Sequence, residues 1–313
     1  MASRLLYILS LVSSCATLKV FFPQSWSANL SSTSSSTTNA AFRNVLGMKS
    51  TQTAWIYSFG RSGSSSMMKL LSGGKSTHSD VYTLFEPCHI GDKADFANCT
   101  EEMRALLQCD FSKVERLVFQ ERDGSTPSSI KSHEECSAAN FRVFKTIHMH
   151  DFRADLLPLI HVMPELRVVV LVRDPRGIYA SAKKHGMVSR SMESLIPANV
   201  LSLKEDSDVT LQFIEYVCGK LVDYASLEEE HVIKVRFEDM IRSSAEGERV
   251  IDFFGLSLDA RLRRTLADVF PPVPDLDAQL VTINHLNASW NDVEKQGFNL
   301  PVCRSAFRLW NYA

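Results

Sequence analysis

Two short segments of the chain place arginine, glycine and hydroxyl side chains directly after an apolar run. The first is residues 60–66, which carry Arg61. The second is residues 168–177, in which a valine-rich run ends at Arg173. Guanidinium groups, and backbone N–H groups at the start of a helix, are groups that hold phosphate in proteins. The two segments therefore predict two anion-binding sites, as a ligand with phosphates at two places would need.

The first segment is similar to a phosphate-binding P-loop but departs from its pattern. The Walker A sequence needs G-x-x-x-x-G-K-[ST], whereas Gly60 and Gly63 enclose a shorter turn in which Arg61 supplies the charge. The donors that follow are hydroxyl groups, on Ser62, Ser64, Ser65 and Ser66. Such a loop can cradle a phosphate through its N–H groups, or it can be a flexible serine turn. No acidic strand end marks a Mg²⁺ site and no C-x-x-C pair marks zinc, so we expect no metal.

The second segment pairs Arg173 with Ser181. Arg173 follows the predicted strand, and Ser181 lies eight residues later, inside the helix expected next. Two helical turns bring the hydroxyl back towards the strand end, so one phosphate could contact both side chains. In the alternative interpretation, Arg173, Asp174 and Arg176 form a structural ion pair that caps the helix.

The elements that must position these residues alternate between strand and helix patterns. Expected strands are residues 54–59, 141–147, 166–172 and 231–235. Expected helices are residues 64–71, 101–107, 152–162, 175–184, 208–230 and 246–254. Residues 124–137, rich in Ser, Pro and charge, are expected to form a surface loop. The alternation predicts a single P-loop-like α/β domain with a mostly parallel sheet flanked by helices.

The composition is that of an ordinary globular protein. Of 313 residues, 45% are hydrophobic and 22% are charged, and the formal net charge is −2. A chain of this size buries a core easily. Because the net charge is close to zero, we expect no nucleic-acid partner, and an anionic ligand must be held by a local patch.

The N-terminal residues 1–22 predict entry into the secretory pathway. Arg4 precedes an apolar run at residues 5–12, and weaker apolar character continues to Phe22. The segment fits an uncleaved signal-anchor with a cytoplasmic N-terminus. It also fits a cleaved signal peptide with Ser14-Cys-Ala16 as the cleavage site. Residues 23–50 are predicted to be a disordered Ser/Thr-rich stem, and residues 51–313 the catalytic domain.

The cysteines and glycosylation sequons suit a secretory lumen. Six cysteines lie beyond the N-terminal segment, an even number compatible with disulfides: Cys88, Cys99, Cys109, Cys136, Cys218 and Cys303. Many pairings are possible, so the sequence does not fix the connectivity. N-x-S/T sequons occur at Asn29, Asn98 and Asn287.

In their order and context, the two motifs resemble those of the Golgi carbohydrate sulfotransferases, particularly the galactose/N-acetylgalactosamine/N-acetylglucosamine 6-O-sulfotransferase group. Arg61-Ser-Gly-Ser-Ser65 is similar to that family's 5′-phosphosulfate loop, and Val172-Arg-Asp-Pro-Arg-Gly-Ile-Tyr-Ala-Ser181 to its 3′-phosphate segment. Further similarities are Leu84-Phe-Glu-Pro87, Cys109-Asp-Phe-Ser112, Val235-Arg-Phe-Glu-Asp239 and the region around Trp290 and Cys303. The family usually has an arginine where this chain has Lys145-Thr-Ile-His148.

The resemblance implies sulfuryl transfer from 3′-phosphoadenosine 5′-phosphosulfate (PAPS) to a sugar hydroxyl of a glycosaminoglycan or glycoprotein. The implied location is the Golgi membrane, as a single-pass type II protein with a lumenal catalytic domain, or secretion after signal cleavage. Arg61 and the N–H groups of residues 60–66 would stabilise charge on the leaving phosphate. Arg173 and Ser181 would hold the 3′-phosphate, whose binding energy positions the sulfuryl group.

The sugar hydroxyl needs a general base, and the best candidate is Glu86, which follows residues 81–85 where the family has its Phe-Glu-Pro element. Flanking Phe85 and Pro87 could desolvate its carboxylate and raise its pKa towards a useful value. The alternative is a solvent-exposed loop acid. Rival bases are His78, His89 and His148. Lys145 could contact the sulfate or substrate, or form a salt bridge.

Two interpretations are open for the basic residues that follow Arg173. The basic residues there are Arg176, Lys183, Lys184, His185 and Arg190. They could hold a sulfated or carboxylated glycan, or form a solvated helix face. Glu238 and Asp239 are expected to cap or pair structurally.

Two other functions remain possible, a protein-tyrosine sulfotransferase and a non-catalytic glycan-binding protein on the same scaffold, although the intact arginines count against the second.

Overall fold

The computed structural model describes most of the chain after residue 51. The described residues are 52–73, 81–85, 99–110, 133–147, 152–163, 165–185, 188, 206–273 and 290–312. The predicted N-terminal segment and stem, and the three sequons, lie outside them. So do the predicted base Glu86, its histidine rivals, and Arg190.

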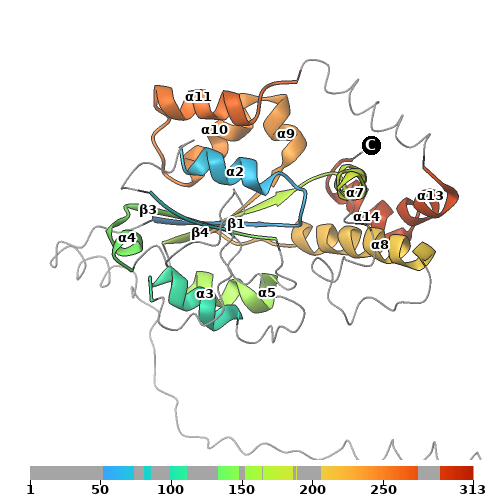
Figure 1. The fold of residues 1–313 in the computed structure, drawn as a ribbon, viewed down its shortest axis with the longest axis horizontal. Coiled ribbons are helices and arrows are strands. Elements are labelled where there is room, and N and C mark those ends of the chain that lie inside the picture. The colour runs from blue at the N-terminus through green and yellow to red at the C-terminus, as the bar shows by residue number, and fades with distance from the viewer. Residues whose placement is uncertain are drawn as a thin grey trace, which may run out of the picture. The chain divides into compact units, whose positions relative to one another are not determined.

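Five parallel strands form one sheet in the order β2-β3-β1-β4-β5 (Figure 1). They are β1 (Gln52–Ser58), β2 (Val81–Phe85), β3 (Phe141–Thr146), β4 (Leu166–Val172) and β5 (Val232–Arg236). Because all four pairings are parallel, the carboxyl ends of the strands share one edge of the sheet. In the register of β1 and β4, Ser58 lies opposite Leu171. The loops that follow these two strands therefore start side by side.

Helices cover both faces of the sheet (Figure 1). One face carries α2 (Ser64–Leu71), α9 (Phe237–Arg242), α10 (Ser244–Phe253) and α11 (Ala260–Val269). The other carries α3 (Cys99–Leu107), α5 (Phe152–Asp155), α6 (Leu157–Val162) and α8 (Asp206–Ala225). The remaining described helices are α4 (His133–Ala138), α7 (Pro175–Lys184), α13 (Asp292–Phe298) and α14 (Pro301–Leu309). Among these, α13 and α14 pack against α8.

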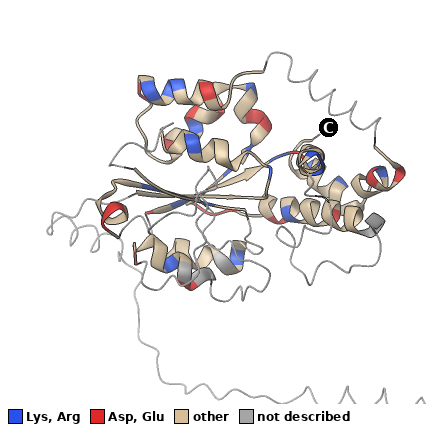
Figure 2. Ribbon diagram, in the orientation of Figure 1, with Lys and Arg blue, Asp and Glu red and all other residues tan. Residues whose placement is uncertain are grey.

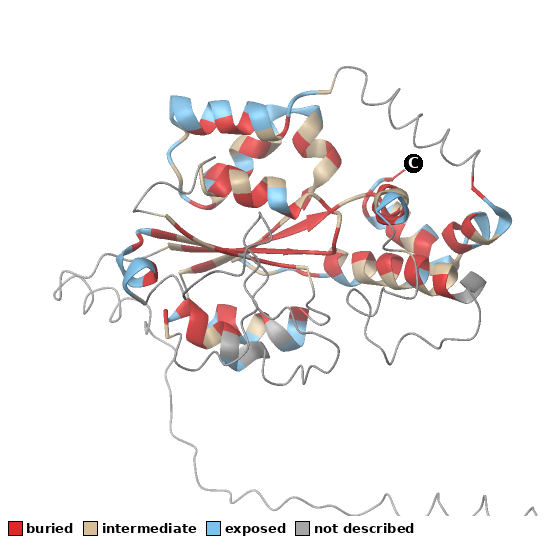
Figure 3. Cartoon of the chain, in the orientation of Figure 1, coloured by how far each residue is buried: buried red, intermediate tan, exposed pale blue. Residues whose placement is uncertain are grey.

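The core is two apolar clusters separated by the sheet. Alternate residues of β1 point to opposite faces, so Trp55 and Tyr57 belong to one cluster and Ala54 and Ile56 to the other. The strands are buried on both sides (Figure 3). A strand buried on both faces reads as a continuous apolar run. This is why the sequence predicted the central strands, and the expected α/β fold with a helix-flanked parallel sheet is confirmed.

Three expected boundaries were wrong. Residues 133–137 belong to α4, not to a loop, because Cys136 is buried and disulfide-bonded there. The helix expected at residues 152–162 is broken into α5 and α6, since Pro158 fits the first turn of the second helix but cannot continue the first. The helix expected to reach residue 230 ends at Ala225. An acidic run follows at residues 228–230, and negative charge is unfavourable at a helix C-terminus.

Two disulfides settle part of the open connectivity. Cys109–Cys136 joins the end of α3 to α4, over a sequence separation of 27 residues. Cys218–Cys303 joins α8 to α14, over a separation of 85 residues. All four cysteines are buried. Within the described part of the chain, no helix is both long and apolar enough to cross a membrane.

Candidate active site

The first predicted segment forms a tight turn between β1 and α2. Gly63 is the N-cap of α2 and has a left-handed backbone, with φ 90°. Arg61, two residues earlier, also has a positive φ of 71°. The N–H groups of Ser64 to Ser66 lie in the first helical turn, where no intrahelical acceptor exists. Together with the positive end of the helix dipole, these N–H groups give the turn the geometry that suits an anion, and anion binding by the turn stays a prediction.

The serines of this turn differ in exposure. Ser62 is fully buried, and its Oγ has no hydrogen-bond partner among the described residues. Ser64 is 5% exposed, whereas Ser65 is exposed and Ser66 is half-buried. The turn therefore presents backbone groups and the Ser65 hydroxyl, while the Ser62 hydroxyl faces the protein interior.

The second segment leads from β4 into α7, whose N-terminus is capped by Asp174. The Asp174 carboxylate accepts a hydrogen bond from the Arg176 backbone N–H (2.8 Å) and pairs with the Arg176 guanidinium at 2.6 Å. The Arg176 guanidinium also lies over the Phe307 ring, 4.8 Å from its centroid. The alternative interpretation, a capping ion pair, is thus correct for Asp174 and Arg176. Arg173 takes no part in this pairing and points elsewhere.

Arg173 points towards the first segment. Its Nη1 donates to the backbone carbonyl of Arg61 at 3.1 Å, and its guanidinium lies 5.0 Å from the centroid of the Phe237 ring. Burial lowers the pKa of Arg173 below its ordinary value, and the nearby Glu238 and Asp174 carboxylates oppose that shift.

Arg61 connects the two segments. Its Nε donates to Ser181 Oγ at 3.0 Å, while its carbonyl accepts from Arg173. The expectation that two neighbouring β-to-α junctions bring Arg61, Arg173 and Ser181 together is therefore correct. The positive charge of Arg61 also acts to lower the pKa of Arg173, and two positive charges that interact in this way favour an anion beside them. Their role as ligands of the donor remains a prediction.

A third cation lies at the same edge of the sheet. Lys145 is 3% exposed, and its Nζ lies 3.5 Å from Ser65 Oγ. The hydroxyls of Ser58 and Thr146, at the carboxyl ends of β1 and β3, are buried with no hydrogen-bond partner among the described residues. Buried polar groups are normally satisfied. The polar strand ends thus fit an anionic ligand better than a sealed apolar core, and no group of three or more potential metal ligands occurs within the described ranges.

Behind the second segment lies a buried carboxylate. Glu238 accepts hydrogen bonds from the Asp174 backbone N–H (2.9 Å) and from the Tyr312 hydroxyl (3.3 Å). Burial raises the pKa of Glu238. The Arg236 guanidinium lies over the Tyr312 ring, 4.6 Å from its centroid. Glu238 is structural, as predicted, but no sequence pattern indicated that Tyr312 supports this segment.

Asp239, the neighbour of Glu238, also forms the structural pairs that the sequence predicted. It lies 3.6 Å from Arg236 and 3.5 Å from Arg242. Its partners are both on its own local segment, at i−3 and i+3. The pair of acids after β5 therefore serves the scaffold.

The basic cluster is partly neutralised within the protein. Lys183 Nζ lies 2.5 Å from the buried Glu294 carboxylate, which also accepts from the Tyr179 hydroxyl at 2.6 Å. Burial acts to raise the pKa of Glu294, but the hydrogen bonds from Lys183 and Tyr179 outweigh it and the pKa is lowered. Basic residues are visible along α7 in Figure 2. Lys183, Lys184 and His185 are all exposed, but the Lys183 ammonium is already paired with Glu294.

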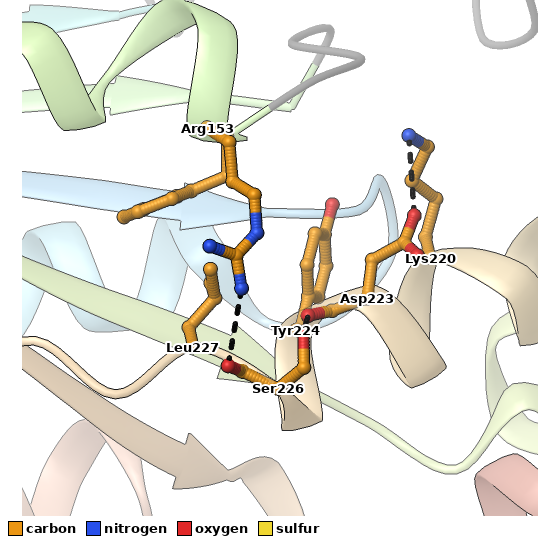
Figure 4. A pocket seen from close by; sticks show the side chains of 7 residues that line it. Arg153, Lys220, Asp223, Tyr224, Ser226 and Leu227 are labelled. Atoms are coloured by element: carbon orange, nitrogen blue, oxygen red, sulfur yellow. Dashed lines mark hydrogen bonds and ion pairs between the residues drawn. The ribbon is translucent and has the colours of Figure 1, made fainter.

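A pocket lies away from these residues, between α5 and α8 (Figure 4). It has a volume of about 210 Å³ and is lined by Phe152, Arg153, Lys220, Asp223, Tyr224, Ser226 and Leu227. Arg153 donates to the Ser226 carbonyl across it. None of the predicted site residues lines this pocket, so it is distinct from the anion-binding cluster.

The predicted base follows a strand that reaches the same edge. Phe85, the last residue of β2, lies opposite Lys145 in the register of β2 and β3. Glu86 comes next in the sequence and lies outside the described residues.

Phosphate-containing ligands commonly bind at the carboxyl edge of a parallel α/β sheet, where this chain has two arginine-bearing β-to-α turns. A family profile described as a sulfotransferase domain matches residues 51–270. This is well over half of the chain, so the chain belongs to the sulfotransferase domain family. Membership confirms the predicted enzyme class, a PAPS-dependent sulfotransferase.

Solved structures similar to the chain are also sulfotransferases. Mouse sulfotransferase SULT7A1 complexed with PAP is 11% identical, with a TM-score of 0.46 over 84% of this chain and 89% of that one. The sulfotransferase domain from the curacin biosynthetic pathway is 14% identical, with a TM-score of 0.44 over 83% and 96%. Sulfotransferase STF9 from Mycobacterium avium is 14% identical, with a TM-score of 0.41 over 87% and 79%. A search of curated protein sequences finds no match.

Proposed function

We propose that the chain transfers a sulfuryl group from PAPS to the 6-hydroxyl of a galactose, N-acetylgalactosamine or N-acetylglucosamine residue in a glycosaminoglycan or glycoprotein. The observation that carries the donor assignment is the position of Arg61, which contacts both Arg173 and Ser181. Anion-binding groups from two junctions thereby form one cluster, which suits a nucleotide with anionic groups at its 5′ and 3′ positions.

The proposed division of labour follows from the contacts. The N–H groups of Ser64 to Ser66 and the Lys145 ammonium would hold the 5′-phosphosulfate, because Lys145 lies beside Ser65. Arg173 and Ser181 would hold the 3′-phosphate. Arg61 would serve both ends, since its backbone shapes the turn while its guanidinium reaches Ser181.

At the acceptor, Glu86 is the proposed general base. It would take the proton of the sugar hydroxyl as that oxygen forms a bond to sulfur and the bond from sulfur to the phosphate oxygen breaks. The strand that precedes Glu86 ends opposite Lys145, which supports a location near the donor sulfate. The choice of sugar and of the 6-hydroxyl rests on the resemblance of the sequence motifs.

We also propose a lumenal location in the Golgi, with residues 1–22 as the membrane anchor, or as a signal peptide if the segment is cleaved. Two buried disulfides support an oxidising compartment. Expression of the full chain in animal cells tests this: peptide N-glycosidase should increase its mobility on a gel. A variant with glutamine at Asn29, Asn98 and Asn287 is the control, and an unglycosylated, cytosolic wild-type chain would contradict the proposal.

The function is tested by sulfate transfer from radiolabelled PAPS to a panel of desulfated glycosaminoglycans, N-glycans and tyrosine peptides. We expect label on the 6-hydroxyl of a sugar. Glu86→Gln should bind PAP, the desulfonated donor, normally but show much lower turnover, whereas Glu134→Gln, at an exposed position of α4, should be fully active. Label on tyrosine peptides would make the chain a protein-tyrosine sulfotransferase, and donor binding with no transfer would favour a glycan-binding protein.

A further inference from the structure

One aromatic ring touches both anion-binding segments. Phe237 follows β5 directly, as the first residue of α9. Its ring lies beneath the Arg173 guanidinium, 5.0 Å from centroid to Cζ. A Cβ added to Gly63 would lie 2.5 Å from ring atom Cδ2 of Phe237, so the ring also packs closely against the turn of the first segment. The Phe237 ring itself carries no group that binds phosphate.

The Arg173 side chain is confined between this ring and the second helix. On the helix side, a Cβ added to Gly177 would lie 3.1 Å from Arg173 Nε. The guanidinium is thus held between the α7 backbone and the Phe237 face, while Nη1 donates to the Arg61 carbonyl. An arginine that is already oriented loses less rotamer freedom when it binds a phosphate.

The ring is in turn fixed in place. Phe270 packs edge-to-face against it, with the ring centroids 6.0 Å apart. The next residue, Glu238, accepts the Asp174 backbone N–H and so connects the start of α9 to the second segment. Both arrangements keep Phe237 at a constant position relative to Arg173.

We infer that Phe237 is a positioning residue for the donor nucleotide: its ring orients the Arg173 guanidinium for the 3′-phosphate and sets the spacing between Arg173 and the Gly63 turn. The inference rests on the proposed placement of the 3′-phosphate at Arg173. It predicts that removing the aromatic face weakens recognition of the 3′-phosphate more than recognition of the 5′-phosphate.

The test compares two ligands by isothermal titration calorimetry with the full chain. PAP carries both phosphates, and 5′-AMP lacks the 3′-phosphate, so the ratio of their affinities measures 3′-phosphate recognition. Phe237→Leu should lower this ratio roughly three- to thirty-fold, the range expected for a lost cation–π contact. Phe237→Tyr keeps the aromatic face and should keep the ratio of the wild type.

A matched control separates positioning from general packing. Phe253 is also half-buried and lies beneath an arginine, with its centroid 5.6 Å from Arg167 Cζ, but it belongs to α10 and its ring packs against Phe254. Phe253→Leu should lower the melting temperature without changing the affinity ratio. If Phe237→Leu does not fold, Phe237→Met fills the same space with a flexible side chain and no π face, and allows the same comparison.

The outcomes distinguish the inference from the proposed function. A lowered ratio in Phe237→Leu, with an unchanged ratio in Phe253→Leu and Phe237→Tyr, supports the inference. If the wild type prefers PAP to AMP and Phe237→Leu keeps that preference in full, the inference is wrong while the proposed donor site stands. If the wild type binds PAP no better than AMP, the proposed 3′-phosphate site is wrong and the inference falls with it.

Discussion

The two anion-binding segments occupy equivalent places in the fold but are held in different ways. Each joins the carboxyl end of an inner strand, β1 or β4, to the helix that follows. The first depends on its own backbone, with positive φ at Arg61 and Gly63 and free N–H groups at the helix start. The second depends on side chains, and residues far along the chain, among them Phe237 and Glu238, hold it in place.

The difference shows that two β-to-α turns at the same edge of a sheet can be held in place by local or by distant residues. A local turn should respond mainly to changes in backbone freedom. A segment that distant residues hold in place should lose ligand affinity when those residues are substituted, even though they do not contact the ligand. The following predictions test this contrast, from the largest expected effect to the smallest.

The largest effect is expected from the Cys218–Cys303 disulfide, which joins α14, the helix before Tyr312, to α8. Replacing both cysteines with serine should lower the free energy of unfolding by about 2–5 kcal/mol. The loss should exceed that for Cys109 and Cys136 by about 1 kcal/mol, because the separations are 85 and 27 residues. Urea denaturation measures both. The preference for PAP over AMP should fall in the Cys218/Cys303 double variant but not in the Cys109/Cys136 double variant. If the preference changed equally in both, distant residues would not be what holds the second segment in place.

A backbone change in the first segment should come next. Gly63→Ala must adopt a φ of 90° and bring its Cβ to 2.5 Å from the Phe237 ring. Together these effects should cost about 2–4 kcal/mol, measured by urea denaturation, and binding of both PAP and AMP should weaken. Gly219→Ala in α8 is the matched control, because its Cβ would meet nothing within 4 Å. It should be neutral or stabilising, and similar losses in both variants would show that the turn has no special requirement.

Removing one guanidinium should have a somewhat smaller effect. Arg61→Ala and Arg173→Ala should each lower the free energy of PAP binding by about 1.5–3 kcal/mol through loss of charged hydrogen bonds, measured by calorimetry. The loss for Arg173→Ala should largely disappear when AMP replaces PAP. Arg304→Ala, at an exposed position of α14, is the control. Unchanged PAP affinity in both site variants would reject the site assignment.

The smallest effects should come from the buried carboxylate behind the second segment. Tyr312→Phe removes one hydrogen bond to Glu238 and should cost about 0.5–1.5 kcal/mol of stability. Because burial raises the pKa of Glu238 above its ordinary value of 4.5, the folded state binds this proton more tightly than the unfolded state. Stability from this group is therefore full below pH 4.5 and is lost as the pH rises through the folded pKa. In a series of urea denaturations at increasing pH, the free energy of unfolding of Glu238→Gln should not show this decrease. If wild type and variant change in parallel with pH, Glu238 does not titrate as predicted.

The elements that the sequence predicted are those whose signals are local. The apolar run of β4 and the glycine–arginine turn after β1 were each visible within about ten residues, and parallel strands bring their ends together. The meeting of Arg61, Arg173 and Ser181 could therefore be predicted. The role of these residues towards the donor still awaits experiment.

The features that were missed depend on contacts between distant parts of the chain. The helix α4 is only six residues long and is joined to α3 by a disulfide, so its own sequence gave no periodic signal. The support of Arg173 by Phe237, 64 residues later in the chain, could not be read from spacing. Tyr312 offered no pattern, since its partners Arg236 and Glu238 lie far back in the sequence, in β5 and α9.

The left-handed backbone of Arg61 has one more consequence. A side chain at φ 71° is strained relative to glycine by roughly 1–3 kcal/mol. Substituting glycine at this position should therefore make the protein more resistant to denaturant while removing the charge that joins the two turns. Directed evolution of this chain for thermostability alone should therefore select that substitution, and the selected variants should be more stable but bind PAP more weakly.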